Sequence, residues 1–109
     1  MPAYDKLVRD KIPEIINESG KTCSYYIAEK DEYKSRLYEK LTEELGEFIA
    51  TPSYEEAADI WEVFSSICRF HNLDIPSVIK AAEEKASSRG GFNDAIILKS
   101  VQDDVENNI

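Results

Sequence analysis

Two long stretches of the chain carry hydrophobic residues at every third or fourth position, which is the spacing of one face of an α-helix. The first stretch predicts a helix from Asp31 to Ile49, and the second predicts a helix from Ser53 to His71. Residues 50–53, with Pro52 among them, break the pattern and predict a short turn. A connection this short makes the two helices antiparallel neighbours.

The second of these helices carries apolar residues around most of its circumference, so we expect it to be largely buried. These residues are Ala57, Ile60, Trp61, Val63, Phe64, Ile67, Cys68 and Phe70. So much apolar surface exceeds what three neighbouring elements readily cover. It therefore predicts a homo-oligomer, most simply a dimer, that assembles through helices.

Two shorter helices flank this pair. The first is predicted to start with Asp10 as its N-cap and to end at Gly20. The other is predicted from Pro76 to Ser88, where Gly90 and Gly91 follow and stop it.

Two further segments are rich in β-forming residues. Residues 21–28 and 95–101 predict two short strands that could pair with each other. Together the elements predict a mainly α fold, a helical bundle with a small peripheral β element. No linker or repeat divides it, so we predict a single domain over residues 1–109, with a frayed tail from about residue 102.

The composition is that of a soluble globular domain, with 109 residues of which 42% are hydrophobic and 32% are charged. No apolar run is long enough for a membrane span, and the N-terminus lacks the apolar stretch of a signal peptide, so we expect a cytoplasmic protein. The net charge of −9 argues against nucleic-acid polymers and anionic membranes as partners.

Most of the excess acid lies in residues 39–62, where Lys40 is the lone base. The acidic residues of this block are Glu39, Glu43, Glu44, Glu47, Glu55, Glu56, Asp59 and Glu62. Within the block, one pair of carboxylates three residues apart lies on each helix. The pairs are Glu44 with Glu47 and Glu56 with Asp59.

A spacing of three places both side chains of a pair on one helix face, where like charges cost about 0.2–0.5 kcal/mol. At about 1.5 Å of rise per residue, the two pairs lie at matching heights on either side of the turn. If they face each other, four carboxylates converge, and such a group requires cations. Oxygen-only ligands suit Mg²⁺ or Mn²⁺, and Mg²⁺ commonly completes its shell with substrate phosphates.

Other readings of these acids stay open. Glu56 stands three residues after Ser53, so the two residues could form a capping box at the start of a helix. Glu39, Glu43 and Glu55 could be solvated surface residues. Glu62 lies on an alternative face with Glu55 and Asp59, and could bind a metal directly or orient a residue that does.

The segment Glu43-Glu44-Leu45-Gly46-Glu47 followed by Glu56-Ala57-Ala58-Asp59 resembles the EExxE…ExxD signature of the MazG-like, all-α nucleoside triphosphate pyrophosphohydrolases. Two more stretches, YDKLVRDKIPEII at residues 4–16 and KASSRGGF at residues 85–92, are similar to the small branch described as phosphoribosyl-ATP pyrophosphohydrolase-like or house-cleaning enzymes. The resemblance covers residues 4 to about 98.

The resemblance implies Mg²⁺-dependent cleavage between the α and β phosphates of a nucleotide, non-canonical triphosphates included, with Mn²⁺ as a substitute metal. It implies Glu44, Glu47, Glu56 and Asp59 as the metal ligands. Members of the family form dimers or higher oligomers, and a second subunit completes some of their sites. The chain departs from the pattern in one respect, because only eight residues separate Glu47 from Glu56.

The chemistry assigns roles to further residues. A carboxylate that holds no metal, Glu43 or Glu47, could orient the attacking water as a general base. Among the basic side chains, arginine suits phosphate oxygens best because its guanidinium presents a fixed fork of donors. Phe92 could equally well pack in the hydrophobic core or stack on a nucleobase. The candidate substrate-binding residues are Lys6, Arg9, Lys11, Lys85, Arg89 and Phe92.

Three functions therefore remain in view. The first is a metal-dependent nucleotide pyrophosphohydrolase, and the second is a phosphoribosyl-ATP pyrophosphohydrolase of histidine synthesis. The third is a helical dimer without catalysis, which would gain nothing from two repulsive carboxylate pairs.

Overall fold

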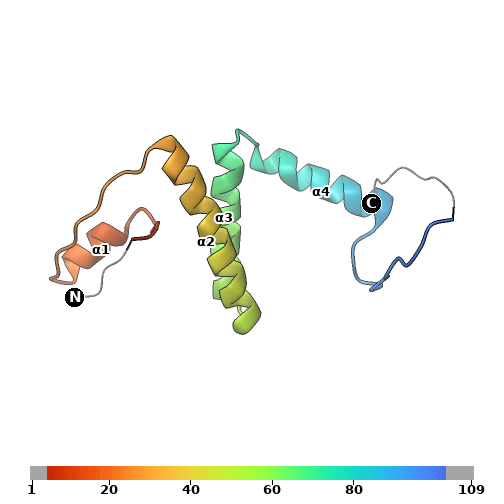
Figure 1. The fold of residues 1–109 in the computed structure, drawn as a ribbon, viewed down its shortest axis with the longest axis horizontal. Coiled ribbons are helices and arrows are strands. Elements are labelled where there is room, and N and C mark those ends of the chain that lie inside the picture. Colours follow the sequence, from red (N-terminus) through yellow and green to blue (C-terminus); the bar gives the residue numbers. More distant parts are fainter. Residues whose placement is uncertain (1–4, 103–109) are drawn as a thin grey trace. The chain divides into compact units, whose positions relative to one another are not determined.

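The computed structural model describes residues 5–102, and four helices lie within this range. In chain order they are α1 (Ile12–Glu18), α2 (Lys30–Ala50), α3 (Tyr54–Phe70) and α4 (Ile75–Arg89) (Figure 1). The predicted mainly α class is therefore confirmed. None of the described helices combines the length and the apolar character that crossing a membrane requires.

The chain divides into two compact units, Met1–Ile75 and Pro76–Ile109. The first unit contains α1, α2 and α3, and the second contains nearly all of α4 and the chain that follows it. The single domain expected over residues 1–109 stays a prediction. The predicted frayed tail lies outside the described residues except for Gln102.

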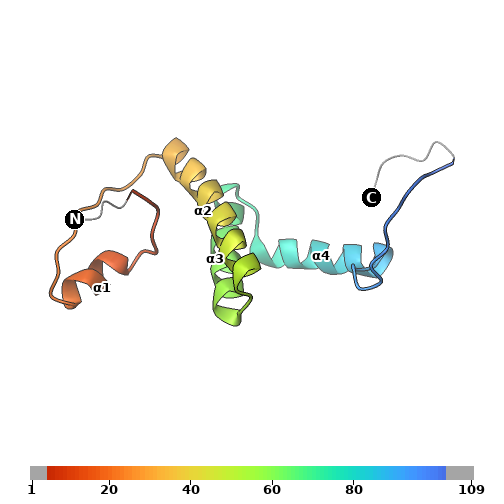
Figure 2. The ribbon, with the colours of Figure 1, turned by 60° about the horizontal axis from the view of Figure 1, so that its bottom comes forward.

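Helices α2 and α3 lie side by side as an antiparallel pair (Figure 1 and Figure 2). Both predicted long helices are thus present, with ends that differ from the predicted ones by about one residue. The start of α3 is set by Ser53, whose side chain accepts a hydrogen bond from the backbone N–H of Glu56 at 3.1 Å. The facing sides of the pair bury Leu37 and Cys68.

Helix α3 is not largely buried, contrary to the prediction. Trp61 on α3 is 51% exposed, and Phe64 is also exposed. The reason is that α2 is the described helix that packs against α3, and one neighbour covers one face. An apolar face of α3 is therefore open in the single chain.

Neither predicted strand is present among residues 5–102. Residues 21–28 and 95–101 are largely exposed, and Ile27 and Ile97 are 85% and 83% exposed. A strand requires a partner for its backbone N–H and C=O groups and a surface for one of its faces. The β-forming side chains specify neither, so both segments lack regular structure.

The N-terminal helix begins slightly later than predicted. Lys11, and not Asp10, occupies the N-cap position of α1, and no side chain caps this end. Pro13 explains the start, because proline has no N–H to satisfy and its fixed backbone angle suits the first helical turn. Gly20 follows the helix with a φ of 86°, as its role as a stop signal requires.

Candidate metal centre

The candidate site lies where the first turns of α3 face the C-terminal half of α2. Lys40 and Glu44 are four residues apart and lie on one side of α2, while Glu56 and Asp59 are three apart and lie on one side of α3. The short connection at residues 51–53 brings these two faces to the same height. This arrangement is the register that the sequence predicted.

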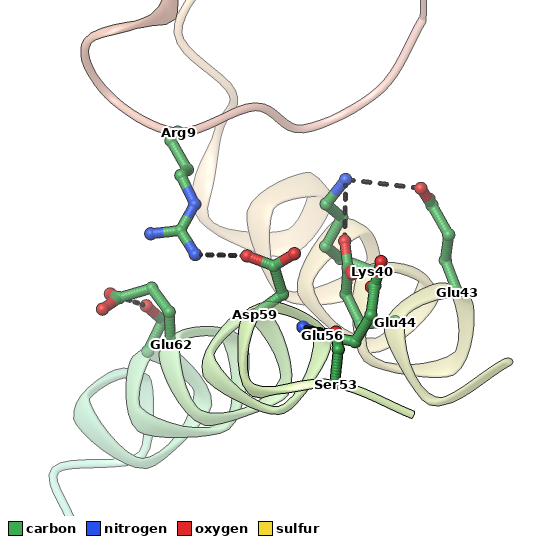
Figure 3. Close-up of polar contacts among 9 residues, drawn as sticks. Arg9, Lys40, Glu43, Glu44, Ser53, Glu56, Asp59 and Glu62 are labelled. Carbon is green, nitrogen blue, oxygen red and sulfur yellow. Dashed lines mark hydrogen bonds and ion pairs between the residues drawn. The ribbon is translucent and has the colours of Figure 1, made fainter. Parts of the chain in front are cut away.

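Three carboxylates come together at this point. One oxygen each from Glu44, Glu56 and Asp59 lies within 4.8 Å of the other two. Figure 3 shows the three side chains pointing into the same space between the helices. These three residues form what we call the acid cluster. Its oxygen-only donor set is the kind that Mg²⁺ and Mn²⁺ bind.

Glu44 is the most buried member of the acid cluster, with 6% of its surface exposed. Burial raises the pKa of its carboxyl group, and the negative charges of Glu47 and Asp59 raise it further. The ammonium of Lys40 opposes this shift, with its Nζ atom 3.4 Å from Glu44 Oε1 and 3.4 Å from Glu43 Oε1. A single lysine therefore shields Glu44 only in part.

Two oxygens of the acid cluster are buried without a hydrogen-bond partner. Within the described part of the chain, these are Glu44 Oε2 and Glu56 Oε2. An unpaired buried polar atom costs about 1–3 kcal/mol, so the fold tolerates a defect here. A divalent cation bound among the three carboxylates would remove that defect, and the residues present therefore fit such an ion.

The capping-box alternative for Glu56 is satisfied only in its first half. Ser53 does cap α3 through the backbone N–H of Glu56. The Glu56 carboxylate, however, belongs to the acid cluster and has its Oε2 atom buried without a hydrogen-bond partner. The cap alone therefore does not account for the glutamate side chain.

Asp59 has a cationic partner from far away in the sequence. Arg9 Nη2 donates a hydrogen bond to Asp59 Oδ1 at 2.7 Å, between residues that are 50 positions apart (Figure 3). The structure thus brings one of the predicted phosphate-binding arginines to the acid cluster.

The other predicted acids lie around the cluster. Glu47 is exposed and is not one of its three members, although its charge reaches Glu44. Glu43 is ion-paired with Lys40. Glu62 accepts from Arg69 at 3.2 Å and from Ser66 at 3.4 Å, so its carboxylate already has partners.

The remaining candidate substrate-binding residues lie in the N-terminal segment or in the second unit. Lys6 and Lys11 are exposed in the N-terminal segment that carries Arg9. Lys85 and Arg89 lie on α4 and Phe92 follows it, 97% exposed, in the second unit. The roles of these residues stay predictions.

Sequence reasoning missed two basic residues near the site. Lys40 was noted only as the lone base of an acidic block. Its position four residues before Glu44 could have predicted the ion pair between them. Arg69 follows Glu62 by seven residues, or two helical turns, and the pair lines the same cavity as Glu44 and Asp59.

A cavity of about 340 Å³ opens beside the acid cluster. Leu7–Asp10 form one wall, α2 contributes Tyr33 and Leu37, and α3 contributes Val63. Glu44 and Asp59 also line it. Its size falls at the lower end of the range for small-molecule sites. Charged side chains, among them Arg9, Lys40, Glu62 and Arg69, make up more of its lining than apolar ones do, which suits a charged ligand.

Comparisons with known proteins place few limits on the function. No family profile matches the chain, and no solved structure matches it. A protein of Mycolicibacterium smegmatis, described as uncharacterized, is 41% identical over 54 residues. The match covers 50% of this chain and 55% of that relative, so the chain spans about half the length of the curated relative it matches.

Proposed function

We propose that this protein is a divalent-cation-dependent nucleotide pyrophosphohydrolase of the MazG-like kind. The observation that carries the proposal is the pair of buried, unpartnered oxygens on Glu44 and Glu56 beside Asp59. A non-catalytic helical module would gain nothing from unpaired buried carboxylates. The resemblance of residues 43–59 to the EExxE…ExxD signature gives the reaction class.

The proposed roles follow from the contacts. Glu44, Glu56 and Asp59 would hold Mg²⁺, which when bound supplies charge neutralisation for phosphates and a polarised water. Glu47 lies close enough for its charge to reach Glu44, and it is proposed as the group that orients the water or as a fourth ligand. Glu43 is less suited to orient the water because its carboxylate shares the Lys40 ammonium.

The cavity gives the proposed substrate a place. Its charged end lies at Glu44, Asp59 and Arg9, where phosphates would bind. Its apolar walls at Leu37 and Val63 would take the nucleoside. The proposed products are a nucleoside monophosphate and pyrophosphate.

The test is a panel of nucleotides with and without Mg²⁺. Canonical, oxidised and deaminated triphosphates and phosphoribosyl-ATP are each incubated with the protein, and pyrophosphate and monophosphate are both measured. We expect both products in equal amounts from at least one nucleotide, and only with the metal. Release of inorganic phosphate instead, or no turnover across the panel, would contradict the proposal.

The panel also separates the two enzyme readings. Turnover confined to phosphoribosyl-ATP would assign the protein to the histidine-synthesis reaction. Turnover of modified triphosphates would assign it to the house-cleaning reaction.

A further inference from the structure

Arg9 binds a carboxylate that the acid cluster also needs. Its Nη2 atom lies 2.7 Å from Asp59 Oδ1, and Asp59 also supplies one of the three clustered oxygens. A guanidinium and a divalent cation both bind this carboxylate by charge. They therefore compete for Asp59, and each weakens the hold of the other.

The ion pair between Arg9 and Asp59 is accessible enough to exchange. The Arg9 side chain is 57% exposed and the Asp59 side chain is 38% exposed. An ion pair open to water in this way changes an equilibrium constant by a factor of about five at most. A divalent ion at its own binding concentration can displace such a partner.

The backbone that carries Arg9 is held independently of Asp59. On one side, Arg36 donates to the backbone oxygen and to the carboxylate of Asp5, at 3.0 Å and 2.9 Å. On the other side, the Arg9 carbonyl accepts a hydrogen bond from Ile12 N at 3.1 Å. When the Arg9 side chain leaves Asp59, its backbone therefore stays at the wall of the cavity.

We infer that Arg9 is an exchangeable partner of Asp59, bound to it without metal and released to the phosphates of the substrate when a divalent cation takes that carboxylate. The inference rests on the proposed function, since it requires a cation at the acid cluster. It makes cation binding and phosphate binding mutually supportive, because the cation frees the group that the phosphates need.

The test compares Arg9→Gln with the parent by isothermal titration, using MgCl₂ alone as the first probe. Removing the competing guanidinium should lower the dissociation constant for Mg²⁺ by about two- to fivefold. Lys21→Gln is the matched control. It removes the same charge in the same unit, at an exposed residue that is neither a candidate substrate-binding residue nor a described wall residue of the cavity. We expect it to leave the Mg²⁺ constant unchanged.

The second probe is methylenediphosphonate, a non-hydrolysable pyrophosphate analogue, titrated at saturating Mg²⁺. Loss of a charge-assisted contact to phosphate should weaken its binding to Arg9→Gln by about tenfold or more. The two titrations thus change in opposite directions. A residue that only held the N-terminal segment in place would weaken both ligands or neither.

Each result decides the matter. If Arg9→Gln binds Mg²⁺ as the parent does, or more weakly, the exchange is wrong while the cation site itself stands. If neither protein binds Mg²⁺, the proposed function fails together with the inference. Equal effects of Arg9→Gln and Lys21→Gln would show that Arg9 acts only through its contribution to the net charge, and would overturn the exchange.

Discussion

Replacing Glu44 with glutamine should change the free energy of unfolding in opposite directions with and without metal. Without metal, the parent keeps Glu44 Oε2 and Glu56 Oε2 buried and unpaired, and each such atom costs about 1–3 kcal/mol. The glutamine amide can donate to the neighbouring carboxylate oxygen and also removes one negative charge. Against this stands the lost contact with Lys40 at 3.4 Å, which costs about 1 kcal/mol because Lys40 keeps Glu43 as a partner.

The balance favours the variant by about 1 kcal/mol without metal, which corresponds to a melting temperature about 4–8 °C higher for a domain of this size. With Mg²⁺ at 100 times its dissociation constant, the parent gains about 2.7 kcal/mol. If the lost ligand weakens binding 100-fold, the variant gains only about 0.4 kcal/mol. The order of stability should therefore reverse, and the parent should become the more stable protein by about 1 kcal/mol.

Urea unfolding in EDTA and in MgCl₂ measures both differences. Glu43→Gln is the matched control, because it also loses a 3.4 Å contact with Lys40 but contributes no oxygen to the acid cluster. We expect it to stay within about 0.5 kcal/mol of the parent in both conditions. A Glu44→Gln variant that is less stable than the parent in EDTA, and that gains as much from Mg²⁺, would refute the reasoning.

Three other predictions follow from the same contacts. Asp59→Asn should abolish pyrophosphate release at saturating Mg²⁺, and near-parental turnover in a steady-state assay would remove Asp59 from the site. The pKa of Glu44 is higher in the folded protein than in the unfolded chain, so the folded protein keeps a proton that the unfolded chain has already released. Below the ordinary glutamate pKa both states are protonated, and Glu44 does not destabilise the fold. As the pH rises from the ordinary pKa through the raised one, the destabilisation by Glu44 grows. The stability advantage of Glu44→Gln in EDTA should therefore increase as the pH rises above the ordinary glutamate pKa, and urea titrations showing the opposite slope would contradict it. Light scattering at micromolar concentration should give about twice the chain mass of 12.4 kDa, since Trp61 and its apolar neighbours on α3 are left open, and a monomer mass would count against this.

The two long helices were predictable because their signals are local. Hydrophobic spacing gave their extent, and Pro52 with the Ser53 cap fixed the turn between them. Segments 21–28 and 95–101 were predicted wrongly as strands for the opposite reason. A strand depends on a partner elsewhere in the chain, which local composition does not identify.

The acid cluster was predictable in part. Spacing and the antiparallel register brought Glu44, Glu56 and Asp59 together, as expected. Glu47 was also expected to join them, but its side chain is exposed and is not among the three whose oxygens cluster, although its charge raises the pKa of Glu44. The contact between Arg9 and Asp59 spans 50 residues, and no helical spacing could have revealed it.

Locating a bound ion tests the central claim most directly. Crystals of the protein grown with MnCl₂ would show manganese by its anomalous scattering, without reference to any substrate. We predict a peak coordinated by oxygens of Glu44, Glu56 and Asp59, and no such peak in crystals of Glu44→Gln grown in the same way. An absence of manganese among these carboxylates at millimolar metal, with the side chains ordered, would contradict the account.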